Sequence, residues 1–192
     1  METEERPIDW VNLPEDARTV SLWDTLHDGE LTSIQSDLLA RTVTLQFDVP
    51  FVREFNQLPE EAGFWLILQG VQSVRAACTK GWPGGFSVPR GASREQESKL
   101  IAEYQTKCRE ESQSWAEFEL LATKADTLDA TLVIGDGAVA LRLGLMANSR
   151  YYEAHIRAKA INFAAGDRQL TLEAFVRLGD AYWEAFSQRR LP

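Results

Sequence analysis

The chain has 192 residues, 44% of them hydrophobic, and a net charge of −9. This composition supports a substantial core, and the length fits a single domain over residues 1–192. No apolar run approaches the roughly 20 residues of a membrane span. The acidic N-terminus lacks the basic and apolar regions of a signal peptide. We therefore expect a cytoplasmic protein with no membrane partner.

The negative charge is concentrated in the N-terminal third. Residues 1–64 hold 14 acidic and 4 basic residues, a net charge of −10, whereas the other 128 residues hold 15 acidic and 16 basic ones, a net charge of +1. Nucleic acid binding needs clustered Lys and Arg, so no nucleic-acid partner is expected. A basic protein partner is compatible with this charge. The alternative interpretation is a solvated surface that maintains solubility.

The N-terminal part of the chain predicts a tail, short helices and a first β-hairpin. Residues 1–9 are expected to form a frayed tail. Apolar residues at roughly helical spacing in residues 10–28, with Pro14 in the first turn, predict one or two short helices. Residues 31–37 predict a strand with a bulge, because their apolar positions break strict alternation. Residues 43–49 alternate cleanly and predict its hairpin partner.

The middle of the chain predicts two further strands. Residues 64–77 carry apolar side chains on both faces, which indicates an interior strand. Gly70 is expected at a bulge or a close packing contact. Residues 115–123 alternate apolar side chains with glutamates and predict another strand.

An insertion is expected between these two strands, over residues 81–113. It begins with a loop rich in Gly and Pro at residues 81–91. A polar helix follows at residues 93–113, and Ser93 with Gln96 forms its capping box.

The clearest local signal is a β-hairpin over residues 128–145. Apolar residues alternate on both sides of Asp136-Gly137, which predicts a tight two-residue turn. Side chains alternate between the two faces, so this turn places the leucines on one face. The expected pairs are Gly135 with Ala138, Ile134 with Val139, Leu132 with Leu141, Ala130 with Leu143, and Leu128 with Leu145.

The C-terminal part predicts one strand and one long helix. Residues 151–163 alternate as a strand, and Thr171 is the expected N-cap of an amphipathic helix over residues 172–186. This helix is expected to cover the sheet face built by residues 128–163. The predicted fold class is α+β, mainly an antiparallel sheet of about seven strands covered by the C-terminal helix, with the polar helix inserted around 93–113.

The sequence contains no P-loop, GxGxxG, GxSxG, HExxH or CxxC motif. The two histidines, His27 and His155, are interpreted as a turn residue and a member of a charged strand face. A metal site that includes them is the alternative. Cys78 and Cys108 are interpreted as ordinary thiols. We therefore assign no catalytic, metal-binding or cofactor-binding residue and expect no cofactor.

Two groups of residues form the candidate binding surface. Aromatic side chains in a loop are suited to binding, and the alternative is that they fold back onto the core. A polar sheet face with several basic residues would line a shallow anion-binding surface, and the alternative is a solvent-facing strand of alternating charge. The candidate residues are Trp82 and Phe86 in the loop, and Arg142, His155, Arg157 and Lys159 on the sheet face.

One segment carries a family resemblance. Residues 26–31, Leu-His-Asp-Gly-Glu-Leu, are followed by Ile34 and by Val-Thr-Leu-Gln-Phe at residues 43–47. This pattern resembles the opening motif of small bacterial β-rich domains that include the immunity protein 50-type family, some of which also end with a helix. The polar helix and the chain length depart from the smaller members. The resemblance implies a non-enzymatic protein that neutralises a partner toxin, with the His-Asp pair as turn residues and no catalytic residues.

Three functions are compatible with these observations. The favoured one is a non-enzymatic, immunity-like protein-binding module that binds a basic partner through its acidic N-terminal third. The alternative is a small-molecule-binding protein or enzyme, with a pocket between sheet and helix near the aromatic loop 81–91. The third is a homodimer that associates through an exposed sheet edge or that loop.

Overall fold

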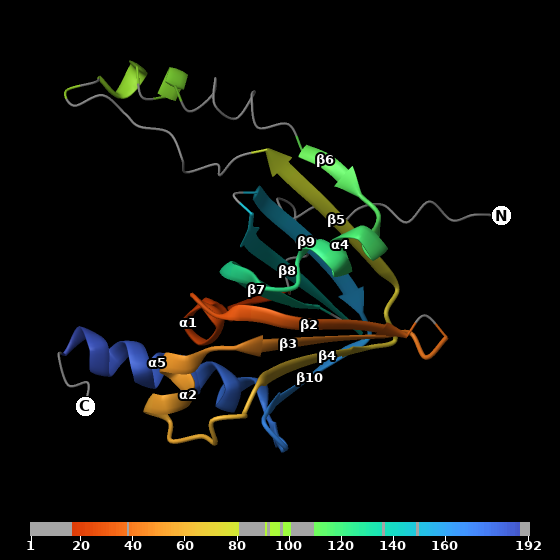
Figure 1. Ribbon diagram of the computed structural model, residues 1–192, viewed down its shortest axis with the longest axis vertical. Coiled ribbons are helices and arrows are strands. Elements are labelled where there is room, and N and C mark those ends of the chain that lie inside the picture. The colour runs from red at the N-terminus through yellow and green to blue at the C-terminus, as the bar shows by residue number, and fades with distance from the viewer. Residues whose placement is uncertain are drawn as a thin grey trace.

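The computed structural model, shown in Figure 1, describes residues 17–37, 39–80, 91, 93–96, 98–100, 110–135, 137–148 and 150–188. The α+β class is confirmed, because a large antiparallel sheet packs against a C-terminal helix. Over these residues the sheet has eleven strands, more than the predicted number of about seven. The predictions for residues 1–9, for Trp82 and for Phe86 lie outside the described residues.

The element bounds are as follows. The strands are β1 (Arg18–Ser21), β2 (Glu30–Asp37), β3 (Thr42–Asp48), β4 (Phe64–Gln69), β5 (Ser73–Lys80), β6 (Glu110–Gln113), β7 (Ala125–Gly135), β8 (Ala138–Ala147), β9 (Arg150–Ala158), β10 (Ala160–Ala165) and β11 (Arg168–Leu170). The helices are α1 (Trp23–Leu26), α2 (Pro50–Phe55), α4 (Trp115–Leu121) and α5 (Leu172–Ser187). Residues 94–96 and 98–100 are also helical.

Two bends divide the sheet into two leaves (Figure 1). β4 and β5 are consecutive in the chain, as are β9 and β10, and β4 pairs with β10 while β5 pairs with β9. The bends lie at residues 70–72 and at Lys159, where the Lys159 N–H donates to the Gln69 carbonyl at 3.0 Å. One leaf therefore contains β2, β3, β4, β10 and β11, and the other contains β7, β8, β9, β5 and β6.

The strand pairing forms a ring, because β4–β5 and β9–β10 each continue through a bend and pair with each other on both sides of it. β3 pairs with β2 and β4 in one leaf, and β8 pairs with β7 and β9 in the other. Opposite the bends, β2 joins β7 through Glu30 facing Asp126 and Leu31 facing Ala125. α4 packs against β5, and its Trp115 indole N–H donates to the Ser36 hydroxyl of β2 at 2.9 Å. The two leaves enclose one core between them, and β6 and β11 are the end strands of the order.

The core is built from every second residue of the inner strands, as side-chain alternation requires. Both leaves contribute to a single cluster of buried apolar side chains. Its members in four of the strands include Val43, Leu45 and Phe47 from β3, Phe64, Leu66 and Leu68 from β4, Leu141, Leu143 and Leu145 from β8, and Tyr152, Ala154 and Ile156 from β9.

The hairpin β7–β8 confirms the predicted register near the turn. Four of the expected pairs are present, from Gly135 facing Ala138 to Ala130 facing Leu143. The fifth was wrong: a register shift between Thr127 and Asp129 places Thr127, not Leu128, opposite Leu145. The extra residue of this bulge leaves Thr127 fully buried, and its hydroxyl has no hydrogen-bond partner among the described residues.

Each of the two longest predicted strands is broken by a bend. The predicted strand at residues 64–77 divides at Gly70, and the one at residues 151–163 divides at Lys159. Gly70 has a φ of +62°, and a Cβ at this position would lie 2.9 Å from the Lys159 Cδ. The prediction of a close packing contact at Gly70 is therefore confirmed, whereas the prediction of continuous strands was wrong.

The segment predicted as a strand at residues 115–123 is helix α4. Ser114 caps the helix, because its hydroxyl accepts a hydrogen bond from the Glu117 N–H and the Glu117 carboxylate accepts one from the Ser114 N–H. This capping box fixes a helix start, and the apparent alternation of the sequence is secondary to it. The predicted box of Ser93 and Gln96 is confirmed, but residues 110–113 form β6 rather than the end of that helix.

The N-terminal predictions are partly confirmed. Residues 18–21 form a strand rather than a helix, and α1 is one of the expected short helices. The predicted bulge of the first hairpin is present as a register shift between Leu31 and Ser33. The connection at residues 51–62 contains part of α2, which begins with Pro50 at its first position.

Helix α5 begins as predicted, with the Thr171 hydroxyl accepting from the Ala174 N–H at 3.1 Å. It packs against α1, α2, β10 and β11, so the prediction that it covers the face built by residues 128–163 holds only for β10. The position of α5 is set by its close approach to α1 at Gly179 and by ring contacts of Phe175 with Phe64 and Phe163.

In the part of the chain that the structure describes, no helix is both long and apolar enough to cross a membrane.

Candidate functional site

The polar cluster, defined as Asp129, Arg142, Tyr151, Glu153 and His155, lies on the outer face of β7, β8 and β9. Arg142 and His155 are direct cross-strand partners, so the antiparallel register brings them together. Arg142 Nη2 lies 3.1 Å from Glu153 Oε2 and Nη1 lies 3.6 Å from Asp129 Oδ2. The other Glu153 oxygen lies 2.5 Å from His155 Nε2. Glu153 therefore links the two sequence-predicted residues.

Electrostatic interactions and burial shift the pKa values of three groups in the polar cluster. The hydrogen bond with His155 and the charge of Arg142 lower the pKa of Glu153, although burial opposes this. Burial and the Glu153 carboxylate raise the pKa of Tyr151. Burial opposes ionisation of Arg142, but Glu153 and Asp129 raise its pKa overall. The cluster thus holds a guanidinium between two carboxylates at a partly buried position on the sheet surface.

The other sequence-predicted residues of this face lie apart from the polar cluster. Arg157 is exposed on the same strand as His155, and Lys159 lies at the bend with its side chain directed at Gly70. The structure therefore brings together only Arg142 and His155 among the four predicted sheet residues. Because the Arg142 guanidinium already faces two carboxylates, the cluster has the composition of an ion network rather than of an open anion site.

Replacing Arg142 by alanine should leave the fold intact and make the free energy of unfolding less dependent on pH in the acidic range. The pKa of Glu153 lies below its ordinary value in the folded state, so its carboxylate stabilises the fold above the unfolded-state pKa. This contribution is lost as pH falls through the folded-state pKa. Without Arg142 the pKa of Glu153 rises and the contribution shrinks. The difference in free energy of unfolding between Arg142→Ala and the unmodified chain should therefore be largest near neutral pH and should approach zero at acidic pH.

Urea unfolding between about pH 7 and about pH 3 measures this difference, and NMR titration of the Glu153 carboxyl carbon measures its pKa directly. Arg157→Ala is the matched control, because Arg157 is exposed on the same strand. A Glu153 pKa that is unchanged by Arg142→Ala would contradict the coupling.

A second cluster, the aromatic patch, is formed by seven side chains from α1, α2 and α5. Trp23 stacks on His27 with ring centroids 4.1 Å apart and on Trp183 at 5.6 Å. The ring centroids of Phe51 and Tyr182 lie 4.8 Å apart, and those of Tyr182 and Trp183 lie 5.1 Å apart. The members of the patch are Trp23, His27, Phe51, Phe55, Tyr182, Trp183 and Phe186.

Carboxylates border the aromatic patch. Asp28 Oδ2 lies 3.3 Å from the Nε2 of His27, which belongs to the patch. The Trp183 indole N–H donates to the Asp24 carbonyl at 2.8 Å. Burial and the nearby Asp180 carboxylate raise the pKa of Asp24, while His27 lowers it. Asp180 follows Gly179, which packs against the Asp24 backbone. The patch therefore combines aromatic rings with the carboxylates of Asp24, Asp28 and Asp180 at its border.

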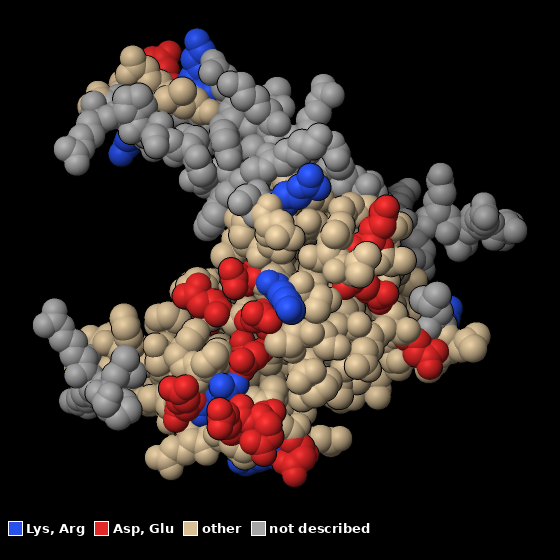
Figure 2. All heavy atoms as spheres, in the orientation of Figure 1, with Lys and Arg blue, Asp and Glu red and all other residues tan. Residues whose placement is uncertain are grey.

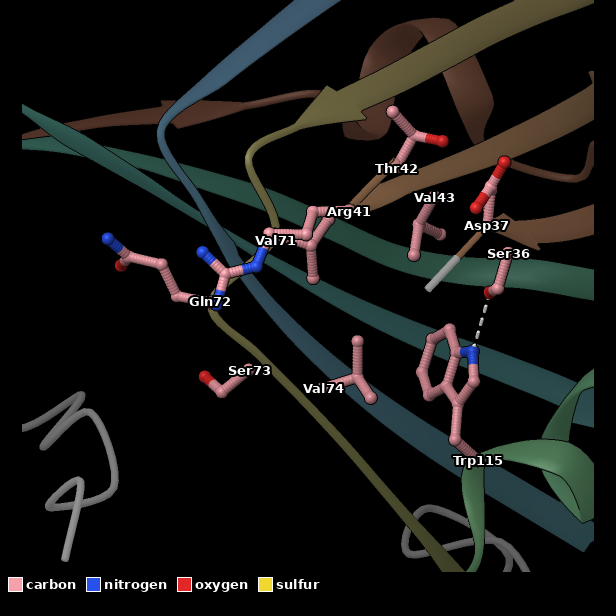
Figure 3. Close-up of a pocket in the computed structure, with 10 residues that line it drawn as sticks. All are labelled: Ser36, Asp37, Arg41, Thr42, Val43, Val71, Gln72, Ser73, Val74 and Trp115. Atoms are coloured by element: carbon pink, nitrogen blue, oxygen red, sulfur yellow. Dashed lines mark hydrogen bonds between the residues drawn. The ribbon is translucent and has the colours of Figure 1, made fainter. Parts of the chain in front are cut away.

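A groove of about 270 Å³ lies beside the turn of the β2–β3 hairpin. Figure 3 shows the Trp115 ring, hydrogen-bonded to Ser36, on one side of it, with Val43 and Val74 nearby. The Asp37 carboxylate accepts from two backbone N–H groups of the hairpin turn. The groove lies beside α4 and not between the sheet and α5, where a pocket was predicted. It is smaller than most ligand sites, which span about 300–1,000 Å³.

The sequence predictions did not include the aromatic patch as a site. Its α5 members were interpreted as part of the stripe that covers the sheet, although the stripe continues to Phe186, beyond the buried residues Phe175 and Gly179. The length of this stripe was the available signal.

Among the residues that the structure describes, no group of three or more His, Cys, Asp or Glu side chains is placed to hold a metal ion. Cys78 is buried, and Cys108 lies outside the described residues. No protein-family model and no curated protein matches the chain.

Proposed function

We propose that this chain is a cytoplasmic, non-enzymatic protein-binding module of the immunity type, which binds a basic protein through its acidic N-terminal third. The observation that carries the proposal is the distribution of charge. Residues 17–64 include 8 acidic and 3 basic residues. Two of these bases are ion-paired, Arg18 with Glu173 and Arg53 with Asp48.

The acidic side chains are available to a partner. Figure 2 shows them gathered over α2 and the neighbouring strands, with fewer basic side chains among them. Glu54, Glu60 and Glu61 are exposed on α2 and the loop that follows it. A surface of one charge accelerates encounter with an oppositely charged partner and disfavours partners of like charge.

The family resemblance adds support from a different part of the same region. Its motif lies at the turn from α1 into β2, where Asp28 adopts a φ of +55° and His27 stacks on Trp23. Both residues lie in the turn before β2, and the resemblance implies a structural role for them there. A toxin-neutralising protein needs a binding surface and no catalytic group.

A charge-reversal experiment tests this proposal. The variant Glu54→Lys, Glu60→Lys, Glu61→Lys should lose the basic partner that the unmodified chain captures from its host. Its affinity for that partner should fall by about tenfold or more. Raising the salt from about 0.05 M to about 0.5 M should weaken the unmodified complex, because screening reduces the attraction.

A matched control carries the same change in net charge elsewhere. Glu95, Asp126 and Asp167 are exposed and lie outside the N-terminal third, so their triple replacement by lysine should leave capture intact. If both triple variants bind equally well, or if the captured partner is acidic, the proposal is wrong.

A further inference from the structure

The aromatic patch lies at the margin of the core, where Phe51 and Tyr182 pack against it. The core already contains fully buried aromatic side chains, among them Phe47, Phe64 and Phe175. Within α5 the buried residues end at Gly179. Figure 1 shows the C-terminal turns of α5 extending past α1 and α2. The aromatic side chains of these turns therefore form a surface layer rather than an inner one.

Every ring of the aromatic patch keeps some contact with solvent. Phe186 is 53% exposed, and the other six side chains are partly exposed. Clustered aromatic side chains that remain partly exposed are a feature of interaction sites. Tyr, Trp and Phe are also the residues that interface cores favour.

The charges around the patch specify the chemistry of the partner. Asp180 follows Gly179, which packs against the Asp24 backbone, so the Asp24 and Asp180 carboxylates are close enough to repel each other. Asp28 Oδ2 lies 3.3 Å from His27 Nε2. A cation placed among these carboxylates would relieve the repulsion, and it would also be attracted to the faces of the tryptophan rings. Arg is the cation best suited to both contacts, because its planar guanidinium stacks on rings and pairs with carboxylates.

The same charges disfavour a second copy of this chain as the occupant. A symmetric dimer through the patch would place the carboxylates of one protomer opposite those of the other. We infer that the aromatic patch is the docking site for a basic amphipathic segment of the partner protein, which places apolar side chains on the rings and an Arg or Lys side chain among the bordering carboxylates. This inference rests on the proposed function and specifies the surface that performs it.

Two conservative variants of the full chain test the docking site. Phe186→Ala removes the most exposed ring, and Asp180→Asn removes one charge without changing the shape of the side chain. The probe is a synthetic amphipathic peptide of arginine and leucine, and its charge control is the same pattern made from glutamate and leucine. Titration calorimetry should show binding of the arginine peptide only, weakened about tenfold by each variant.

Leu120→Ala is the matched control, because Leu120 is 79% exposed on α4, outside the patch. This variant should bind the arginine peptide as the unmodified chain does. The indole N–H resonance of Trp183 should shift on binding, while that of Trp115 on α4 should not. Melting curves should match for all three variants, since each replaces an exposed side chain.

The outcomes separate this inference from the proposed function. Equal binding of the arginine peptide by the unmodified chain, Phe186→Ala and Asp180→Asn would overturn the docking site. Equal binding of the arginine and glutamate peptides would also overturn it. If the partner is lost on reversal of Glu54, Glu60 and Glu61 but kept by both patch variants, the proposed function stands and the docking site is wrong. If the peptide results hold but charge reversal leaves capture intact, the proposed function fails instead.

Discussion

Leu141→Asp is expected to prevent folding. Leu141 is fully buried in β8, where it faces Leu132 on one side and Ile156 on the other. The substitution removes a packed leucine side chain, at a cost of about 2–5 kcal/mol. It also buries a carboxylate among apolar side chains, a further cost that no neighbouring cation offsets. Since a domain of this kind has a total stability of only about 5–15 kcal/mol, circular dichroism should show no cooperative unfolding transition.

Thr131→Asp is the matched control for this substitution. Thr131 lies on the same hairpin but on its outer face, directly opposite Arg142. A carboxylate there remains partly solvated and has the Arg142 guanidinium beside it, although it loses the hydrogen bond from the Thr131 hydroxyl to Asp129. The fold should therefore persist with a loss of about 1–2 kcal/mol. A cooperative melt of Leu141→Asp at the temperature of the unmodified chain would contradict the assignment of the leucine face to the core.

The contrast between these two positions shows why the hairpin could be predicted from the sequence. A tight turn fixes which residues face each other, and strict alternation then divides them between two faces. The local pattern and the tertiary environment agree near Gly137. At Thr127 they diverge, because a bulge depends on how the strand meets its neighbours.

Helix α4 has a capping-box pattern in its sequence that predicts a helix more specifically than its short alternation predicts a strand. Alternation over a few residues is compatible with a helix when the spacing of the apolar residues is four, as for Phe118 and Ala122, which are both fully buried. Ser114 and Glu117 have the spacing of a capping box. That signal is specific for a helix start and takes precedence over a short alternating run.

The bends and the aromatic patch could not be predicted in the same way. The break at Gly70 depends on its contact with Lys159, which is remote in the sequence. The position of α5 depends on its approach to α1, again a long-range contact. Periodicity identifies which face of a helix is apolar, but it does not show where the helix passes the edge of its sheet. The exposed end of α5, and with it the candidate docking site, required the structure.

Gly179→Ala is expected to separate α1 from α5 and to disrupt the aromatic patch without changing any of its rings. A Cβ at this position would lie less than 3.0 Å from Asp24 and Thr25 backbone atoms, a separation that real Cβ atoms essentially never show. α1 cannot move away freely, because the Thr25 hydroxyl donates to the Phe175 carbonyl at 3.0 Å and the Trp183 indole to the Asp24 carbonyl at 2.8 Å. We expect a net loss of about 2 kcal/mol or more in the free energy of unfolding.

An unconstrained helix glycine would behave in the opposite way, since alanine stabilises a helix interior by about 1 kcal/mol relative to glycine. The sign of the change in urea unfolding therefore decides whether the two helices are in close contact. Gly135→Ala is the matched control, because a Cβ there meets no atom within 4 Å.

In Gly179→Ala the near-ultraviolet dichroism of the Trp23–Trp183 stack should fall, and the arginine peptide should bind more weakly although Phe186 and Asp180 are unchanged. A variant that is more stable than the unmodified chain and binds the peptide equally well would show that the α1–α5 contact does not hold the patch together.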